Sequence, residues 1–143
     1  MLLNIGLASL MLIVTSGIHA GGMLLVSSLF QVEVHRQIKY LRVFRVLRIS
    51  SVVIMMFLAS CLEALVWAGM YLALNAMEGF EKALYFSMVT YSTLGYGDVV
   101  LHDRWRLLSA FESANGIIMF GWTTAIVIAA VQRLYAFAGK TDK

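Results

Sequence analysis

The sequence has few charged residues, a single cysteine and no proline. Of its 143 residues, 13% are charged and 61% are hydrophobic, with a mean hydropathy of +0.83. Soluble domains carry about 25% charged residues, so this composition argues against a soluble globular protein. The lone Cys61 excludes an internal disulfide. We therefore expect a small protein that lies mostly in lipid.

Three long apolar runs are predicted to cross the membrane as helices. They cover about residues 2–30, 49–74 and 107–134, and each exceeds the roughly 20 residues that a spanning helix needs. A signal peptide is the alternative for the first run. Such a peptide begins with a basic segment, whereas the side chains of residues 1–5 carry no charge. We therefore prefer an uncleaved membrane helix.

A basic connector is predicted between the first two runs, over residues 32–49. Its basic side chains recur at every third position: Arg36, Lys39, Arg42, Arg45 and Arg48. Cytoplasmic loops are enriched in Lys and Arg, so the connector is predicted to be cytoplasmic and the N-terminus to lie outside. Voltage sensors show the same period, but they need acidic partner helices, and the one preceding run has no acidic residue. We expect an interfacial helix that binds anionic lipid, at about 1 kcal/mol per basic residue.

A shorter apolar segment, residues 80–91, lies between the second and third runs. It is too short to span and is predicted to be a re-entrant helix. The motif Thr-Leu-Gly-Tyr-Gly-Asp follows at residues 93–98. Irregular backbone at membrane depth is tolerated only where it is buried in protein or lines a water-filled path. Rings of backbone carbonyls can replace the hydration shell of potassium there, and glycine permits the backbone angles required.

The residues around this motif have separate predicted roles. A helix that ends near Tyr91 would direct its partly negative C-terminus at the water-filled cavity, which favours a cation. Ser92 marks the change from helix to extended chain. The Thr93 hydroxyl adds an oxygen at the inner end, Tyr96 points away from the pore, and Asp98 accepts hydrogen bonds behind the segment.

Residues 50–135 resemble the pore domain of the two-helix potassium channel superfamily, notably its small bacterial members. The resemblance rests on the motif at 93–98 and on residues 111–122 of the third run. It implies an all-α membrane protein with three transmembrane helices, a re-entrant pore helix and a selectivity-filter strand, assembled as a homotetramer in the bacterial inner membrane. Residues 1–31 would be an extra N-terminal helix, and 136–143 a short cytoplasmic tail.

The resemblance also implies the ion ligands. Potassium would be the permeant ion, with no other cofactor and no nucleic-acid partner, and the filter residues would be Thr93, Leu94, Gly95, Tyr96 and Gly97. Leu94 stands where many members have valine or isoleucine. Residues 99–103, Val-Val-Leu-His-Asp, lack the proline that often follows the filter, which indicates a differently shaped outer mouth.

The third run is predicted to line the pore. Gly116 matches the hinge glycine of the superfamily by its distance from the filter, and a glycine lowers the cost of bending a helix. Close helix packing is an equally good explanation of this glycine. Helical spacing from Gly116 places four residues on the pore side: Phe120, Thr124, Ile128 and Gln132. The last two of these are the candidates for a cytoplasmic constriction.

Three ionisable residues fall inside the predicted spans: His19, Glu63 and Glu112. Such residues are functional candidates because their burial in a membrane is costly. Glu112, one turn before Gly116, is expected to attract cations or to brace the pore helix. Glu63 is expected to tie helices together, and His19 to be a packed residue. Protonation of any of the three is a hypothesis for pH-dependent gating.

The sequence thus predicts a potassium-selective channel subunit. A weakly selective cation channel and a non-conducting scaffold with the same fold are the alternatives. An enzyme is not expected, because no serine, histidine or cysteine constellation suggests catalysis and no ligand set fits zinc.

Overall fold

The computed structural model describes residues 1–31 and 42–141. These residues form four helices: α1 (Leu2–Gln31), α2 (Arg42–Ala73), α3 (Phe80–Tyr91) and α4 (Arg106–Thr141). The all-helical fold class is confirmed, and the short α3 has the bounds predicted for the re-entrant helix. The predicted filter strand is irregular backbone that pairs with no strand in the described chain.

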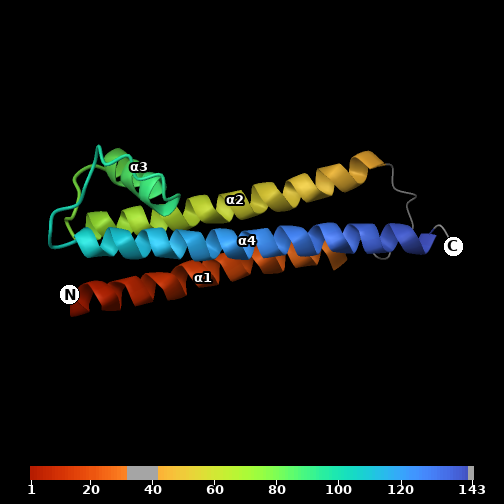
Figure 1. Cartoon of the computed structure of the whole chain (residues 1–143), viewed down its shortest axis with the longest axis horizontal. Helices are drawn as coiled ribbons and strands as arrows, with labels where there is room; N and C mark the ends of the chain where they lie inside the picture. Colours follow the sequence, from red (N-terminus) through yellow and green to blue (C-terminus); the bar gives the residue numbers. More distant parts are fainter. Residues whose placement is uncertain (32–41, 142–143) are drawn as a thin grey trace.

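The three long helices run side by side, and the short α3 lies at one end of the molecule (Figure 1). There α3 packs on both α2 and α4, while α1 packs along α2 and α4. The N-terminus lies at the same end as α3, and the C-terminus lies at the opposite end. The beginning of α1 and the segment after α3 therefore lie at the same end of the molecule.

Three of the helices are long and apolar enough to cross a membrane, over Leu2–Ser28, Val46–Ala73 and Arg106–Arg133. The protein is therefore an integral membrane protein. The three spans agree with those predicted from the sequence.

The ends of two helices differ from the prediction. Helix α2 begins at Arg42, so nearly half of the predicted connector belongs to this helix, and α4 continues to Thr141 through most of the predicted tail. Arginine, leucine and alanine are good helix formers, so neither stretch has a reason to stop the adjoining helix. Arg36 and Lys39 lie outside the described residues.

The chain reverses direction between α2 and α3 in a capped turn. Asn75 has a φ of 49°, and the N–H groups of Asn75 and Ala76 donate to the carbonyls of Leu72 and Tyr71 at 3.0 and 2.9 Å. This pattern is a Schellman motif with asparagine in the left-handed position, where asparagine is accepted more readily than most residues. The turn sends α3 back along α2.

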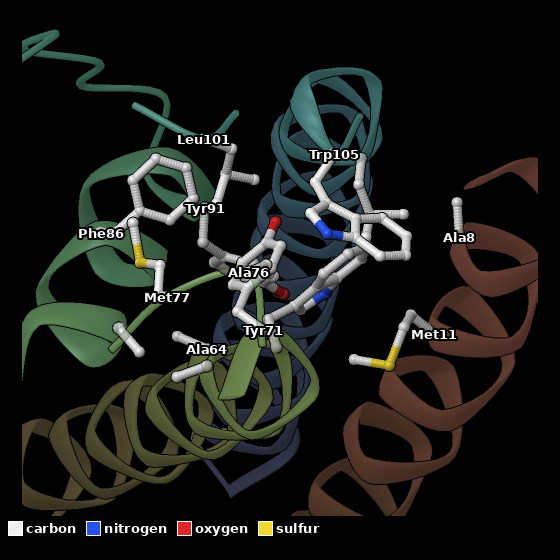
Figure 2. Close-up of a cluster of buried hydrophobic side chains, with 14 of the residues drawn as sticks. Ala8, Met11, Ala64, Tyr71, Ala76, Met77, Phe86, Tyr91, Leu101 and Trp105 are labelled. Carbon is white, nitrogen blue, oxygen red and sulfur yellow. The ribbon is translucent and has the colours of Figure 1, made fainter. Parts of the chain in front are cut away.

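The larger cluster of buried apolar side chains lies around α3 (Figure 2). Helix α2 contributes Trp67 and Tyr71, the loop before α4 contributes Trp105, and α1 contributes Ala8 and Met11. A second cluster joins the other halves of α1, α2 and α4. At membrane depth such contacts replace contacts with lipid, so they stabilise the fold through close packing. Helix α1 is thus packed into both clusters.

Candidate ion-conduction site

The segment that follows α3 is tied back to that helix by its N–H groups. Thr93 donates to the Thr90 carbonyl at 3.0 Å, and Leu94 and Gly95 donate to the Val89 carbonyl at 3.0 and 3.2 Å. The first two bonds form a second Schellman motif, in which Thr93 holds the left-handed position. The start of the segment is therefore fixed by the C-terminal turn of α3.

Positive φ angles recur at every second residue of the segment. They are 61° at Thr93, 55° at Gly95 and 76° at Gly97. Glycine adopts such angles without strain, whereas a β-branched threonine there is an outlier that costs on the order of 1–3 kcal/mol. Strained backbone of this kind clusters at functional sites. The sequence motif places glycine at two of the three positions that need it.

The carbonyl groups of the segment, unlike its first N–H groups, have no hydrogen-bond partner in the part of the chain that the structure describes. Within the described residues, no protein hydrogen bond ends on the carbonyl oxygen of Thr93, Leu94, Gly95 or Tyr96. The side chains of Leu94 and Tyr96 are 54% and 67% exposed in the single chain. Backbone acceptors at membrane depth need partners. Four successive free acceptors therefore suit a cation, water or another copy of the chain.

Asp98 is held from behind by α3. The Tyr85 hydroxyl donates to Asp98 Oδ2 at 2.7 Å, and the Val99 N–H donates to Asp98 Oδ1 at 3.0 Å. The hydrogen bond to Asp98 raises the pKa of Tyr85 above 10.0, because it stabilises the neutral phenol. Sequence reasoning assigned Asp98 a supporting position but did not identify Tyr85 as its partner.

Gly116 lies against the end of α3. A Cβ atom built on Gly116 would overlap the carbonyl oxygen of Tyr91. The packing interpretation of this glycine thus has direct support, since no other residue leaves room for the contact. Next to it, the Ser113 hydroxyl donates to the Thr90 carbonyl at 3.0 Å. Helix α4 is continuous through both residues.

Glu112 is fully buried and joins α4 to α2 and α3. The Tyr71 hydroxyl donates to Glu112 Oε2 at 2.6 Å, and Ser87 Oγ lies 2.5 Å from Glu112 Oε1. Ser87 also donates to the Ala64 carbonyl at 2.7 Å. Ser87 has one hydroxyl proton for two acceptors. A protonated Glu112 that donates to Ser87 would satisfy the whole group. The carboxyl group therefore joins α4 to both α2 and α3.

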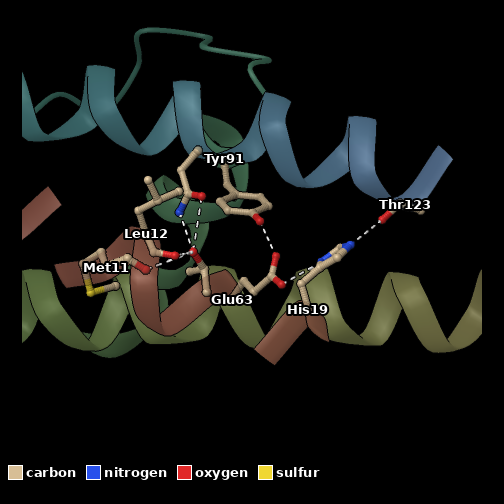
Figure 3. A network of polar contacts seen from close by, with 8 residues as sticks. Met11, Leu12, His19, Glu63, Tyr91 and Thr123 are labelled. Atoms are coloured by element: carbon tan, nitrogen blue, oxygen red, sulfur yellow. Dashed lines mark hydrogen bonds and ion pairs between the residues drawn. The ribbon is translucent and has the colours of Figure 1, made fainter. Parts of the chain in front are cut away.

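Glu63 is also fully buried and lies at the centre of a second polar network (Figure 3). It accepts a hydrogen bond from the Tyr91 hydroxyl of α3, and its Oε1 lies 2.9 Å from His19 Nδ1 of α1. His19 Nε2 in turn lies 3.2 Å from the Thr123 hydroxyl of α4. This network connects all four helices. Glu63 and His19 are therefore packed, hydrogen-bonded residues, as their structural interpretation predicted.

Two further polar contacts attach α1 to the rest of the chain. The side chains of Thr15 and Asn115 bond to each other between α1 and α4, with Asn115 Nδ2 donating to Thr15 Oγ1 at 2.9 Å. Near the N-terminus, Asn4 donates to the Arg104 carbonyl at 2.9 Å. Sequence reasoning missed these pairs because each joins residues that are 100 positions apart.

The four predicted pore-lining residues share an exposed side of α4 in the single chain. Phe120 is 38% exposed and Ile128 is 51% exposed, and Thr124 and Gln132 are exposed as well. By contrast, Met119, Ile126 and Ala130 are buried against the other helices. The exposed side is thus available for a pore or for another copy of the chain.

These features define a class of protein: an integral membrane protein with a re-entrant helix that ends in a loop of free carbonyls. Comparison with known families matches residues 43–133 to the family described as "Ion channel". The match covers well over half of the chain, and the protein belongs to this ion channel family. It covers nearly all of α2, all of α3 and the whole membrane-spanning part of α4, whereas α1 precedes it. Neither the curated proteins nor the solved structures give a match to the chain.

Proposed function

We propose that the protein is one subunit of a potassium-selective channel that conducts passively through a central pore. The observation that supports this proposal is the hydrogen-bond pattern of the segment after α3. Its first three N–H groups bond to α3, while the carbonyls of Thr93, Leu94, Gly95 and Tyr96 remain free. Potassium filters use such carbonyls in place of water around the ion. The Thr93 hydroxyl is a further oxygen at the inner end.

A single segment cannot surround an ion, so the proposal requires four copies around one axis. Two observations support assembly of this kind. The segment exposes Leu94 and Tyr96, which are large hydrophobic residues whose exposure to water is unfavourable. The side of α4 that carries Phe120 and Ile128 is also left uncovered by the chain itself. In the proposed homotetramer, that side of α4 lines the path below the filter.

The charge distribution supports an orientation in the membrane. Helix α2 begins with Arg42, Arg45 and Arg48, at the end opposite the free carbonyls. Basic residues favour the cytoplasmic side, so the filter and the N-terminus would face outward. We propose that these three arginines, with Arg36 and Lys39, bind anionic lipid at the inner surface of a bacterial cell membrane.

The test is ion flux from proteoliposomes that contain the purified protein. We expect potassium flux to exceed sodium flux by at least about tenfold, which corresponds to about 1.4 kcal/mol, and we expect barium to block it. Gly95→Ala should abolish the selectivity, because alanine is strained at a φ of 55°. Gly79→Ala is the matched control, since Gly79 also has a positive φ, of 85°, but lies before α3.

Each alternative has its own result in this assay. Equal potassium and sodium flux would indicate a weakly selective cation channel. No flux from correctly assembled protein would indicate a non-conducting scaffold. Loss of selectivity in Gly79→Ala as well as Gly95→Ala would mean that general strain, rather than the filter, explains the effect.

A further inference from the structure

Helix α1 lies outside the region that matches the ion channel family, yet it reaches the end of the pore helix through side chains. His19 of α1 contacts Glu63 of α2, and Glu63 accepts a hydrogen bond from Tyr91, the last residue of α3 (Figure 3). We call these three residues the relay. Tyr91 lies two positions before Thr93, so the relay ends where the candidate filter begins.

The relay is a direct route from α1 to α3. Packing contacts join α1 to α2 and α4, but in the described chain no Cα atom of α1 lies within 8 Å of one in α3. Glu63 bridges this separation with its two carboxyl oxygens, one facing each helix. Glu63 therefore links His19 to Tyr91 through a single carboxyl group.

Burial makes the relay energetically important. His19 and Glu63 have no exposed surface, and Tyr91 is 2% exposed. A buried polar group without a partner is costly, so each member requires the next. Tyr91 is also held on its other sides. Its carbonyl oxygen contacts Gly116, and its ring meets Phe120 edge-on at 5.6 Å. The hydroxyl connects Tyr91 to α1 through Glu63.

We propose that α1 positions the selectivity filter through this relay, so that His19 determines how long the filter stays in its conducting form. His19, Glu63 and Tyr91 act as positioning residues, since none of them lies among the proposed ion ligands. The proposal rests on the proposed potassium channel function. It assigns a regulatory role to α1, which lies outside the region matched to the ion channel family.

The test is a double-mutant cycle on single channels in planar bilayers, with mean open time and the potassium-to-sodium permeability ratio as readouts. Tyr91→Phe removes one hydroxyl and keeps the ring, and His19→Leu removes the group that holds Glu63. We expect each single change to shorten the mean open time at least about fivefold, the lower range of coupling between distinct sites. The double variant should resemble the more affected single variant.

Two control variants separate positioning from general loosening of α1. Thr15→Val removes another buried hydroxyl that joins α1 to α4, without touching the relay. It should leave the mean open time within about twofold of wild type, a difference within the usual error of additivity. His19→Gln keeps a donor for Glu63 and should restore most of the open time that His19→Leu loses.

The outcomes against the proposal are distinct from failure of the channel function. If wild type passes no potassium, the proposed function fails before the cycle begins. If wild type conducts selectively and the two changes multiply to about 25-fold, they act independently and the relay is wrong. Unaltered open times in assembled single variants would also overturn it. Should His19→Leu not assemble, Thr123→Val replaces it, because that change removes only the hydroxyl next to His19 Nε2.

Discussion

Two buried glutamates hold the same short helix in different ways. Glu112 of α4 contacts Tyr71 and Ser87, and its network stays within α2, α3 and α4. Glu63 of α2 contacts Tyr91, but its other oxygen faces His19 of α1. Both side chains are fully buried, and each accepts a hydrogen bond from a tyrosine.

The two networks differ in whether they include α1, the helix that precedes the region matched to the ion channel family. All members of the Glu112 network lie within residues 43–133, the region matched to the ion channel family. The Glu63 network is incomplete without α1, which precedes that region. Glu112 therefore stabilises contacts within the region matched to the ion channel family. Glu63 is the point at which the additional helix is connected to it.

The largest expected effect is the loss of Glu63. Glu63→Ala leaves both His19 Nδ1 and the Tyr91 hydroxyl without their buried partner, so we expect a destabilisation of about 3–5 kcal/mol. Glu112→Ala should cost only about 1–3 kcal/mol, because Ser87 keeps the Ala64 carbonyl and only Tyr71 loses its acceptor. Denaturant unfolding of the purified protein in detergent measures both. A larger loss of unfolding free energy in Glu112→Ala than in Glu63→Ala would contradict this contrast between the two glutamates.

The next effect concerns the contact at the end of α3. Gly116→Ala forces a methyl group against the Tyr91 carbonyl, which is backbone and cannot rotate away. We expect a destabilisation of about 1–3 kcal/mol from overpacking, together with reduced potassium flux. Gly121→Ala is the control on the same helix, because nothing lies within 4 Å of a Cβ there. Equal behaviour of the two variants would show that the close contact is unimportant.

A smaller effect is expected when the ionisable group of Glu112 is removed but its shape is kept. In Glu112→Gln, the amide can donate to Ser87 and accept from Tyr71, so the stability should change by less than about 1 kcal/mol. Channel current recorded across a pH series should then match that of wild type. A pH response that is present in wild type and lost in Glu112→Gln would instead make Glu112 a pH sensor.

The smallest effect is expected at the exposed bond between Tyr85 and Asp98. Because this bond raises the pKa of Tyr85 above 10.0, the folded state holds the phenol proton more tightly than the unfolded state. The stability advantage of wild type over Tyr85→Phe should be complete below pH 10 and should decline as the pH rises through the raised pKa. Unfolding measured at several alkaline pH values tests this. A constant advantage would contradict it.

Much of the fold could be predicted because membrane helices have a clear length and composition signal. The three spans and the bounds of α3 followed from apolar runs and from their lengths. The beginning of α2 was misjudged because its arginines were assigned to a separate connector, and the end of α4 because the last residues were taken as a short tail. Arginine at the beginning of α2 does not interrupt the helix, since it forms helices well and can extend its charged group towards the membrane surface.

The candidate site was predicted less completely. The motif at 93–98 gave the residues with free carbonyls, because glycine and the preceding helix are visible in the sequence. The partners of Glu63, Glu112 and Asp98 were not visible, since hydrogen bonds between helices follow from packing and not from spacing along the chain. The sequence offered one signal for these contacts, the presence of tyrosines alongside acidic residues in apolar segments. Sequence reasoning did not use this signal to pair them.

The contact between Gly116 and Tyr91 has a mechanical consequence. Two backbones that touch without an intervening side chain behave as a stiff joint, because neither has a rotamer that can absorb movement. If α4 bent at Gly116, the end of α3 would have to travel with it or the joint would separate. Movement of the C-terminal half of α4 and the shape of the segment after α3 would therefore be coupled through this backbone contact.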